Sequence, residues 1–453
     1  MNPQPDLEDP AGEATVLVPD QLLRGFAMVL AGVGVGALTG AGFWLIAAHL
    51  HPSADVGRAS GLFTSVLFVC FITGLGLPVA VSRFAGRPAP GSASLFTWSL
   101  VLSAVVSAVG ALLYLDLVDS PAVAVLDARG WLGRVLFAVI AVGGSLTLLV
   151  DVRLMAARRW GWLLARITAV GLGQLALLLA VGDRVSEAAL WMFLAAAGPA
   201  ALSGFAGVVL LPALVHQGYR LRPAPADARP MVRYATVNYV ATLALEAPRF
   251  ALPVIVLVNV TPTANANFYL AWGLVAVVLL VPTGLGQVLL VEASRSERPS
   301  RRQLAVAGLT GVGVMALTWI AALVASDVIP RLYGPDYRSA ARLVPLLVAA
   351  GMPWSLTSVA LADARVRNDH AGTLVITFGL SGLVLAPAAL LVPRYGIDGV
   401  GLPWLVGNVV AAGIALAVLH RGRERSPSQV SVSSSTALAT GTADDRTLPV
   451  PRR

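Results

Sequence analysis

The chain has 453 residues, of which 57% are hydrophobic and only 12% are charged, and its mean hydropathy is +0.78. A soluble protein of this length needs about twice that charged fraction to cover its surface, so the composition excludes a soluble globular protein. The formal net charge of +8 does not indicate nucleic-acid binding, because the basic residues, all of them arginines, lie mostly in short segments between apolar runs.

Twelve apolar runs, each long enough to cross the hydrocarbon core as a helix, follow one another along the chain. They predict an all-α integral membrane protein with about 12 transmembrane helices in two parallel six-helix lobes around a central cavity. The predicted spans are 24–49, 59–83, 93–115, 131–154, 160–182, 187–214, 233–259, 267–292, 303–326, 339–363, 371–393 and 397–419.

Polar segments divide these spans into units. We expect a cytoplasmic N-terminal tail at 1–21, a first lobe at 22–215, a cytoplasmic linker at 216–232, a second lobe at 233–419 and a disordered, Ser/Thr-rich cytoplasmic tail at 420–453. With the N-terminus inside, the loops and ends on that side hold 22 arginines and those on the opposite side hold 8. The positive-inside rule therefore places both termini in the cytoplasm, and we expect a multi-pass protein of the plasma membrane.

The two halves resemble each other in sequence. The stretch 51–76 aligns without gaps with the stretch 261–286 at an offset of 210 residues, with six identities in 26 positions and the shared ending TGLG. The same offset superimposes the first span on the seventh. A duplicated unit of six helices keeps the same topology in both copies, so the repeat predicts parallel halves, and paired repeats with a site between them are a common transporter plan.

The seventh span carries an acid and a base in its apolar middle. Glu246 and Arg249 are three residues apart, so they share a helix face and can neutralise each other. A lone charge at this depth costs on the order of 3 kcal/mol. Pro248 and Pro253 lack an N–H, which leaves the carbonyls of Ala244 and Arg249 without their helical partners. This face is predicted to avoid lipid, either because it lines a hydrated cavity that binds substrate or because the pair holds packed helices together.

Other polar residues add weaker candidates for the cavity. Asn238 lies on the same face as Glu246 and offers a further hydrogen-bond donor. Arg166 lies about two turns inside the fifth span, where it either lines the inner mouth of the cavity or extends to the lipid headgroups. Arg24 begins the first span, where anchoring at the membrane surface competes with a substrate-binding role. The first span also has five glycines between Ala31 and Gly42, which predicts an interrupted helix there.

Two clusters at inner helix ends are expected to belong to cytoplasmic loop networks: Asp151 with Arg153, and Asp363 with Arg365. No loop is long enough for a soluble catalytic domain. The sequence also lacks a phosphate-binding P-loop, a dinucleotide-binding fingerprint, clustered His and Cys metal ligands, and the paired carboxylates of glycosidases. We therefore predict a protein that is not an enzyme and that needs no cofactor or metal.

Three stretches resemble a known transporter superfamily. They are AAHLHPSADVGRASGLFTSVLFVCFITGLGLPVAVSRFAG at 47–86, IPRLYGPDYRSAARLVPLLVAAGMPWSL at 329–356 and VPRYGIDGVGLPW at 392–404. Together with twelve spans in two sixes, they are similar to the multidrug/oligosaccharidyl-lipid/polysaccharide exporter superfamily, and within it to the polysaccharide transporter branch with the O-antigen flippases. The resemblance covers nearly all of residues 22–419.

The resemblance implies a V-shaped pair of lobes that opens alternately to the two sides of the membrane. The implied cargo is a polyprenyl-pyrophosphate-linked oligosaccharide, which moves from the inner to the outer leaflet, and the implied partners are a glycan polymerase or glycosyltransferases besides the membrane lipids. Arginines bind phosphate in bidentate fashion, so Arg249, with Arg166 and Arg24 nearer the entrance, would bind the headgroup. The alternatives are a drug/cation antiporter of the same superfamily and a lipid II flippase. A membrane glycosyltransferase or glycan polymerase would need catalytic residues in outer loops, which the sequence does not show, and an inactive scaffold for such an enzyme is a further alternative.

Overall fold

A computed structural model describes residues 19–78, 81, 92–181, 187–216, 218–221, 228–293 and 300–424. The expected N-terminal tail lies almost entirely outside these residues, as does the expected C-terminal tail from residue 425 onward. Within the described ranges the regular structure is entirely helical, and twelve helical stretches are long and apolar enough to cross a membrane. The predicted all-α architecture with twelve spans is confirmed.

The first half supplies six of these spans and a short helix. Its helices are α1 (Pro19–Leu50), α2 (Ser53–Thr73), α4 (Ser92–Leu117), α5 (Val123–Asp127), α6 (Trp131–Ala156), α7 (Trp160–Val181) and α8 (Ala188–Val215). The second span was predicted to begin at residue 59, but α2 already begins at Ser53. The turn that precedes α2 is therefore shorter than the sequence suggested, because Pro52 is followed at once by helix.

The second half supplies the other six spans. Its helices are α9 (Ala228–Asn259), α10 (Pro262–Val278), α11 (Leu280–Ala293), α12 (Arg301–Val324), α13 (Val328–Tyr333), η1 (Pro335–Tyr337), α14 (Arg338–Ala349), α15 (Gly351–Val366), α16 (His370–Tyr395) and α17 (Asp398–Glu424). The eighth span is divided at Leu279 between α10 and α11, and the tenth at Ala350 between α14 and α15. Helix α9 begins five residues before the predicted span, inside the expected linker.

Local chemistry explains where several of these helices begin. The Thr261 hydroxyl accepts a hydrogen bond from the amide of Ala264, and Pro262 occupies the first helical position of α10, where its missing N–H leaves no bond unmade. Ser300 and Gln303 form a reciprocal capping box at the start of α12. Gly334 has φ +99° between α13 and η1, a conformation that disfavours residues with a Cβ, so the YGPDY motif makes a sharp turn there.

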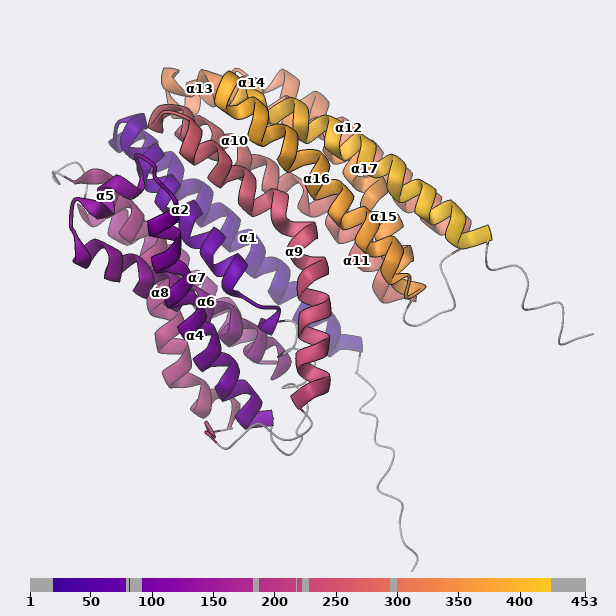
Figure 1. Cartoon of the computed structure of the whole chain (residues 1–453), viewed down its shortest axis with the longest axis horizontal. Coiled ribbons are helices and arrows are strands. Elements are labelled where there is room, and N and C mark those ends of the chain that lie inside the picture. Colours follow the sequence, from indigo (N-terminus) through magenta and orange to yellow (C-terminus); the bar gives the residue numbers. More distant parts are fainter. Residues whose placement is uncertain are drawn as a thin grey trace, which may run out of the picture.

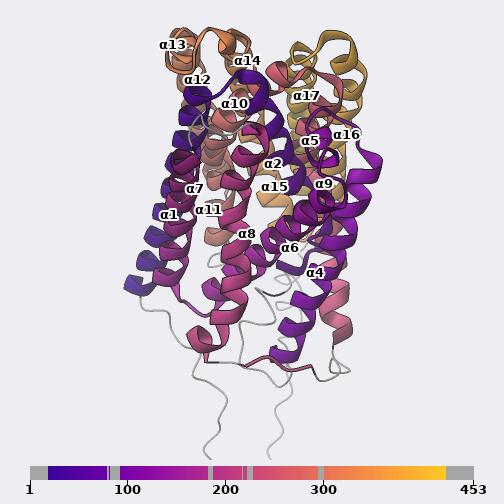
Figure 2. The same ribbon diagram turned by 90° about the vertical axis from the view of Figure 1, so that its left-hand side faces the viewer.

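The two halves form two lobes that meet at one end and spread apart at the other (Figure 1). Helices α5 and α13 lie at the end where the lobes meet, whereas the start of α1 and the end of α17 lie at the opposite end (Figures 1 and 2). Between the lobes, α2 packs against α9 and α10, and α1 packs against α10 and α13. We call the two ends the junction end and the termini end.

Hydrogen bonds between the lobes join them at the junction end. The Ser53 hydroxyl of α2 donates to the Asp336 carboxylate of η1 at 2.8 Å, and the Asn265 side-chain amide of α10 donates to the carbonyl of Gly57 in α2 at 2.8 Å. Asn267 holds η1 in place, because its amide donates to the Asp336 carbonyl at 2.9 Å. A Cβ on Gly57 would lie 1.7 Å from the Pro262 carbonyl oxygen, so only glycine permits this approach.

The backbone also shows a correspondence between the halves. Arg158, after α6, and Asn368, after α15, both have left-handed backbone conformations with φ values of 55° and 54°. Their separation, 368 − 158, equals the offset of 210 residues in the sequence repeat. The fourth and tenth spans therefore end in the same kind of turn at equivalent positions of the two halves.

Candidate functional site

The charged pair of α9 is the first candidate site. One Nη of Arg249 lies 3.6 Å from a carboxylate oxygen of Glu246, and the side chains are 55% and 35% exposed, respectively. At that separation the attraction is electrostatic, because a hydrogen bond between nitrogen and oxygen needs about 2.7–3.2 Å. The Arg249 guanidinium also lies 5.6 Å from the centroid of the Phe250 ring. Most of its five N–H donors therefore point away from Glu246 and are available to a ligand.

A second arginine lies near the Glu246 carboxylate. Arg365, in the last turn of α15, is close enough to Glu246 for electrostatic attraction. It was expected in a loop network with Asp363, and the structure corrects this: Asp363 is bonded instead to Arg367 at 2.7 Å and to Arg423 at 3.3 Å. One carboxylate between two guanidinium groups leaves the cluster of Glu246, Arg249 and Arg365 with one positive charge in excess.

The contacts of α9 show which way the pair faces. On one side, Leu245, which shares a helix face with Leu252, packs against a core cluster of α15, α16 and α17 in the second lobe, and on another side the Phe250 ring stacks on Phe71 of α2 at 4.4 Å. At 3.6 residues per turn, Arg249 and Glu246 lie roughly 60° and 120° around the helix from Leu252, and Phe250 lies roughly 160° around. The pair therefore occupies the sector between the second lobe and α2.

Exposure along this sector changes with depth. Arg249 and Glu246 are accessible, whereas Pro253, one turn closer to the junction end, is buried. The opposite sector of α9 carries Val240 and Val258, which are both exposed and apolar. The apolar sector suits lipid, and the charged sector needs water or protein. Along this sector, α9 is therefore accessible at Arg249 and Glu246 and covered one turn nearer the junction end.

The proline in the middle of α9 has a specific partner. Pro248 was expected to leave the carbonyl oxygen of Ala244 without a hydrogen-bond donor. In the structure, the buried hydroxyl of Ser381 in α16 donates a hydrogen bond to that oxygen. The spare acceptor is therefore used for packing α9 against α16, not for holding a ligand. Helix α9 continues through both Pro248 and Pro253.

The remaining predicted site residues lie elsewhere. Arg166 is paired with Asp151 of α6 and donates to the Ser203 hydroxyl of α8 at 3.1 Å. It therefore connects three helices within the first lobe, and Asp151 is its partner instead of a member of the expected loop network. Arg24 and Asn238 lie on α1 and α9, but both fall outside the residues whose side chains the structure describes.

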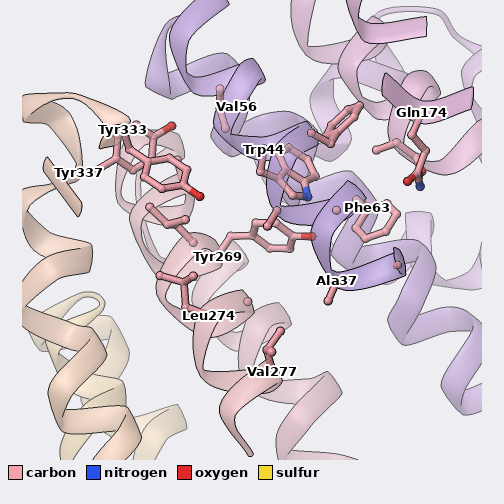
Figure 3. A pocket seen from close by; sticks show the side chains of 18 residues that line it. Ala37, Trp44, Val56, Phe63, Gln174, Tyr269, Leu274, Val277, Tyr333 and Tyr337 are labelled. Carbon is pink, nitrogen blue, oxygen red and sulfur yellow. The ribbon is translucent and has the colours of Figure 1, made fainter. Parts of the chain in front are cut away.

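A cavity of about 320 Å³ lies between α1, α2, α7, α8, α10, α13 and η1. Aromatic rings from α1, α2, α10, α13 and η1 surround it, including Trp44, Phe63, Tyr269, Tyr333 and Tyr337 (Figure 3). The Trp44 ring meets the Tyr269 ring at 4.9 Å and the Phe63 ring at 6.2 Å in edge-to-face geometry. No charged side chain belongs to the lining, which consists wholly of described residues. The cavity is thus aromatic and electrically neutral.

Few polar groups reach this cavity. The Gln174 amide nitrogen donates to the Ala196 carbonyl at 2.6 Å, which leaves its amide oxygen as an acceptor. Tyr337 is 3% exposed, and its hydroxyl has no hydrogen-bond partner in the described part of the chain. An unpaired buried hydroxyl costs about 1–3 kcal/mol. Burial also raises the pKa of Tyr333, outside the spans, so its hydroxyl stays neutral at physiological pH.

Sequence reasoning pointed to part of this cavity and missed the rest. The glycine-rich zone was predicted to interrupt the first span, and this is wrong, because α1 is continuous over Pro19–Leu50. Gly36 and Gly40 from this zone line the cavity, and a Cβ on Gly40 would meet nothing within 4 Å. The aromatic residues were not singled out, because an aromatic side chain in an apolar span is usually a packing residue. Their only sequence signal was Tyr333 and Tyr337 in the YGPDY motif.

Solved structures with the same fold are transporters. The lipid II flippase MurJ in an inward closed conformation matches with a TM-score of 0.66 and 10% identity, over 88% of this chain and 87% of that chain. An inward-facing multidrug resistance MATE family transporter of the MOP superfamily matches with a TM-score of 0.62 and 15% identity, over 90% and 99%. A MOP superfamily transporter from Pyrococcus furiosus has a TM-score of 0.53 and 15% identity, over 89% and 95%.

The chain therefore has the fold of MOP superfamily transporters. At these identities the likeness concerns the fold alone, and the cargo has to be argued from the site. No protein-family model matches the chain, and no curated protein matches it in sequence.

Proposed function

We propose that the protein is a membrane transporter that moves a polyprenyl-pyrophosphate-linked oligosaccharide from the inner to the outer leaflet by alternating access. The fold, the two lobes and the resemblance of three sequence stretches to polysaccharide transporters support this proposal. The enzymes that assemble or polymerise the glycan are its expected partners, and the plasma membrane with both termini in the cytoplasm is its expected place.

The cluster of Glu246, Arg249 and Arg365 is the observation that carries the proposal. It has one excess positive charge, and its Arg249 guanidinium is exposed on the sector of α9 between the second lobe and α2. A pyrophosphate is an anion with several acceptor oxygens, and a guanidinium donates to two of them at once. Displacement of Glu246 from Arg249 by the ligand costs little, because the two groups are 3.6 Å apart and not hydrogen-bonded.

The arrangement of the lobes supplies a route for alternating access. The lobes spread apart at the termini end (Figure 1), and Arg365 of the charged cluster lies in the last turn of α15. The contacts of Ser53 with Asp336 and of Asn265 with Gly57 close the junction end. In alternating access, these contacts must break when the junction end opens, and new contacts must form between the lobes at the termini end. Because few hydrogen bonds hold the junction end, this conformational change is energetically feasible.

The alternatives use the same fold. An antiporter for cationic drugs needs a carboxylate that is free to bind a cation, and Glu246 is already attracted to two arginines. A lipid II flippase would use the same pyrophosphate-binding chemistry, and it therefore shares the charge argument but transports a different headgroup. The neutral aromatic cavity is compatible with aromatic drugs as well as with sugars, so transport assays must include both classes.

Arg249→Ala tests the proposal in a strain that lacks the chromosomal gene. We expect radiolabelled lipid-linked glycan to accumulate in the inner leaflet in the deletion strain and with Arg249→Ala, and to return to normal with the wild-type chain. Arg394→Ala is the matched control, because Arg394 is exposed and bonds only a carbonyl of its own helix, that of Leu390. Protein amount in the membrane is measured for every variant.

Three results would contradict the proposal. Unchanged glycan in the deletion strain combined with increased sensitivity to cationic drugs would identify the antiporter. Normal glycan transport by Arg249→Ala would show that the charged pair only packs helices. If peptidoglycan precursors accumulate in place of surface-glycan precursors, the protein is a lipid II flippase.

A further inference from the structure

We propose that the aromatic cavity bounded by Trp44, Phe63, Tyr269 and Tyr337 is a subsite for an uncharged sugar ring of the transported glycan. The inference rests on the proposed function, and it adds a second binding region to the charged cluster on α9. The cavity lies between the lobes on the α1 and α10 side, and none of its lining residues comes from α9.

The rings provide surfaces that suit a sugar. Trp44, Phe63 and Tyr269 meet one another edge to face, with centroids 4.9–6.5 Å apart. The faces of aromatic rings are electron-rich, and the C–H bonds on one face of a hexose are weakly positive. A sugar ring can therefore lie on an aromatic face while its hydroxyl groups point to the cavity's edge.

The polar groups of the cavity also suit hydroxyls. The Tyr337 hydroxyl is buried and has no partner in the described part of the chain, and the Gln174 oxygen is an available acceptor. When a site contains a buried donor without a partner, a ligand that accepts its hydrogen bond binds more favourably than an analogue that cannot. Neutral tyrosine hydroxyls and an amide match a ligand that carries hydroxyls and no charge.

Size and charge narrow the class of ligand. A volume of about 320 Å³ is at the lower end of the range for small-molecule sites, which is about 300–1,000 Å³, so the cavity fits one or two sugar rings and not a long oligosaccharide. A cationic drug would find no carboxylate in the lining and would be attracted only by the faces of the aromatic rings. The neutral lining therefore favours the sugar.

The cavity also borders the contact that joins the lobes. Tyr337 lines the cavity, and its neighbour Asp336 accepts the hydrogen bond from Ser53. Both residues belong to the three-residue helix η1. A sugar that hydrogen-bonds Tyr337 thus contacts the same segment that closes the junction end.

Photo-crosslinking in cells tests the subsite. Phe63 is replaced by p-benzoylphenylalanine, cells are labelled with radioactive sugars, and the protein is purified after illumination. We expect radiolabel on the protein that remains after mild acid has cleaved the glycosyl-phosphate bond, because the crosslink is to the sugar. The control is the same replacement at Phe205, an exposed residue of α8; a crosslink there is to lipid, so acid removes its sugar label.

Tyr337→Phe provides a second measurement. The variant removes a buried hydroxyl that has no partner within the described protein, so its unfolding temperature should equal or exceed that of the wild-type protein, whereas glycan transport should fall about 2- to 10-fold. Tyr395→Phe is the control, because Tyr395 is an exposed tyrosine outside the cavity. Equal transport by the two variants would overturn the subsite.

The outcomes separate the subsite from the proposed function. If glycan transport depends on the protein but Phe63 gives no acid-resistant label, the subsite is wrong and the function stands. If tetraphenylphosphonium prevents crosslinking at Phe63, the cavity binds cations, which also overturns the subsite. If deletion of the gene leaves lipid-linked glycan unchanged, the proposed function is wrong, and the subsite fails with it.

Discussion

The contact between Ser53 and Asp336 should control how often the junction end opens. Ser53→Ala removes a 2.8 Å hydrogen bond to a carboxylate that joins the two lobes. A hydrogen bond to a charged group contributes about 1.5–3 kcal/mol, but Asp336 is exposed and screening by water lowers this to roughly 1 kcal/mol. The open population should therefore rise on the order of 5-fold.

Cysteine accessibility measures this population. Cys70 is the chain's single cysteine and is buried, so a Cys70→Ser background permits one reporter thiol. Gly40→Cys places it in the aromatic cavity, where a Cβ meets nothing within 4 Å. A membrane-impermeant maleimide added on the junction side should label it about 5-fold faster in the Ser53→Ala variant.

A matched serine provides the control. Ser326 follows α12 at the junction end, and its hydroxyl donates only to the Leu323 carbonyl of the same lobe. Ser326→Ala should leave the labelling rate unchanged. Equal labelling rates for the Ser53→Ala and Ser326→Ala variants would refute the idea that this hydrogen bond holds the lobes together.

Two further substitutions test the packing between and within the lobes. Gly57→Ala puts a methyl group 1.7 Å from the Pro262 oxygen, so the lobes must separate. The rate at which the Gly40→Cys thiol is labelled from the junction side should then exceed the rate in the Ser53→Ala variant. An unchanged labelling rate would contradict the close approach of Gly57 to Pro262. Ser381→Ala leaves the Ala244 carbonyl unpaired and should lower the free energy of unfolding by about 1–3 kcal/mol, measured by denaturation in detergent. Thr377→Val is its control, because Thr377 bonds only within its own helix; equal losses would argue against a special role for Ser381.

Local properties of the sequence predicted the helices well. The first span was predicted at 24–49 and the structure has an apolar span at Ala27–Leu50; the last was predicted at 397–419 and lies at Asp398–Arg423. The prediction works because a helix in lipid satisfies its own backbone hydrogen bonds and needs a fixed apolar length. The breaks at Leu279 and Ala350 were missed, since the apolar runs continue across them.

The candidate site was predictable only where its residues are close in sequence. Glu246 and Arg249 share a face of one helix, and the spacing of three residues was sufficient to predict their proximity. The third member, Arg365, is 116 residues after Arg249. Because it lies two residues after Asp363, the sequence suggested that it belongs with Asp363 and gave no sign that it lies near Glu246. The pairing of Arg166 with Asp151 was missed because it depends on how α7 and α6 are rotated toward each other.

The sequence by itself determined the membrane environment, the twelve helices and a charged pair on one face of the seventh. These follow from composition and from the period of the α-helix, which are local properties. Only the tertiary structure decided that the lobes meet at one end, that Ser381 satisfies the carbonyl freed by Pro248, and that aromatic residues from five helical elements surround a neutral cavity. Such contacts depend on the rotation and depth of each helix against its neighbours, and packing between distant segments sets both.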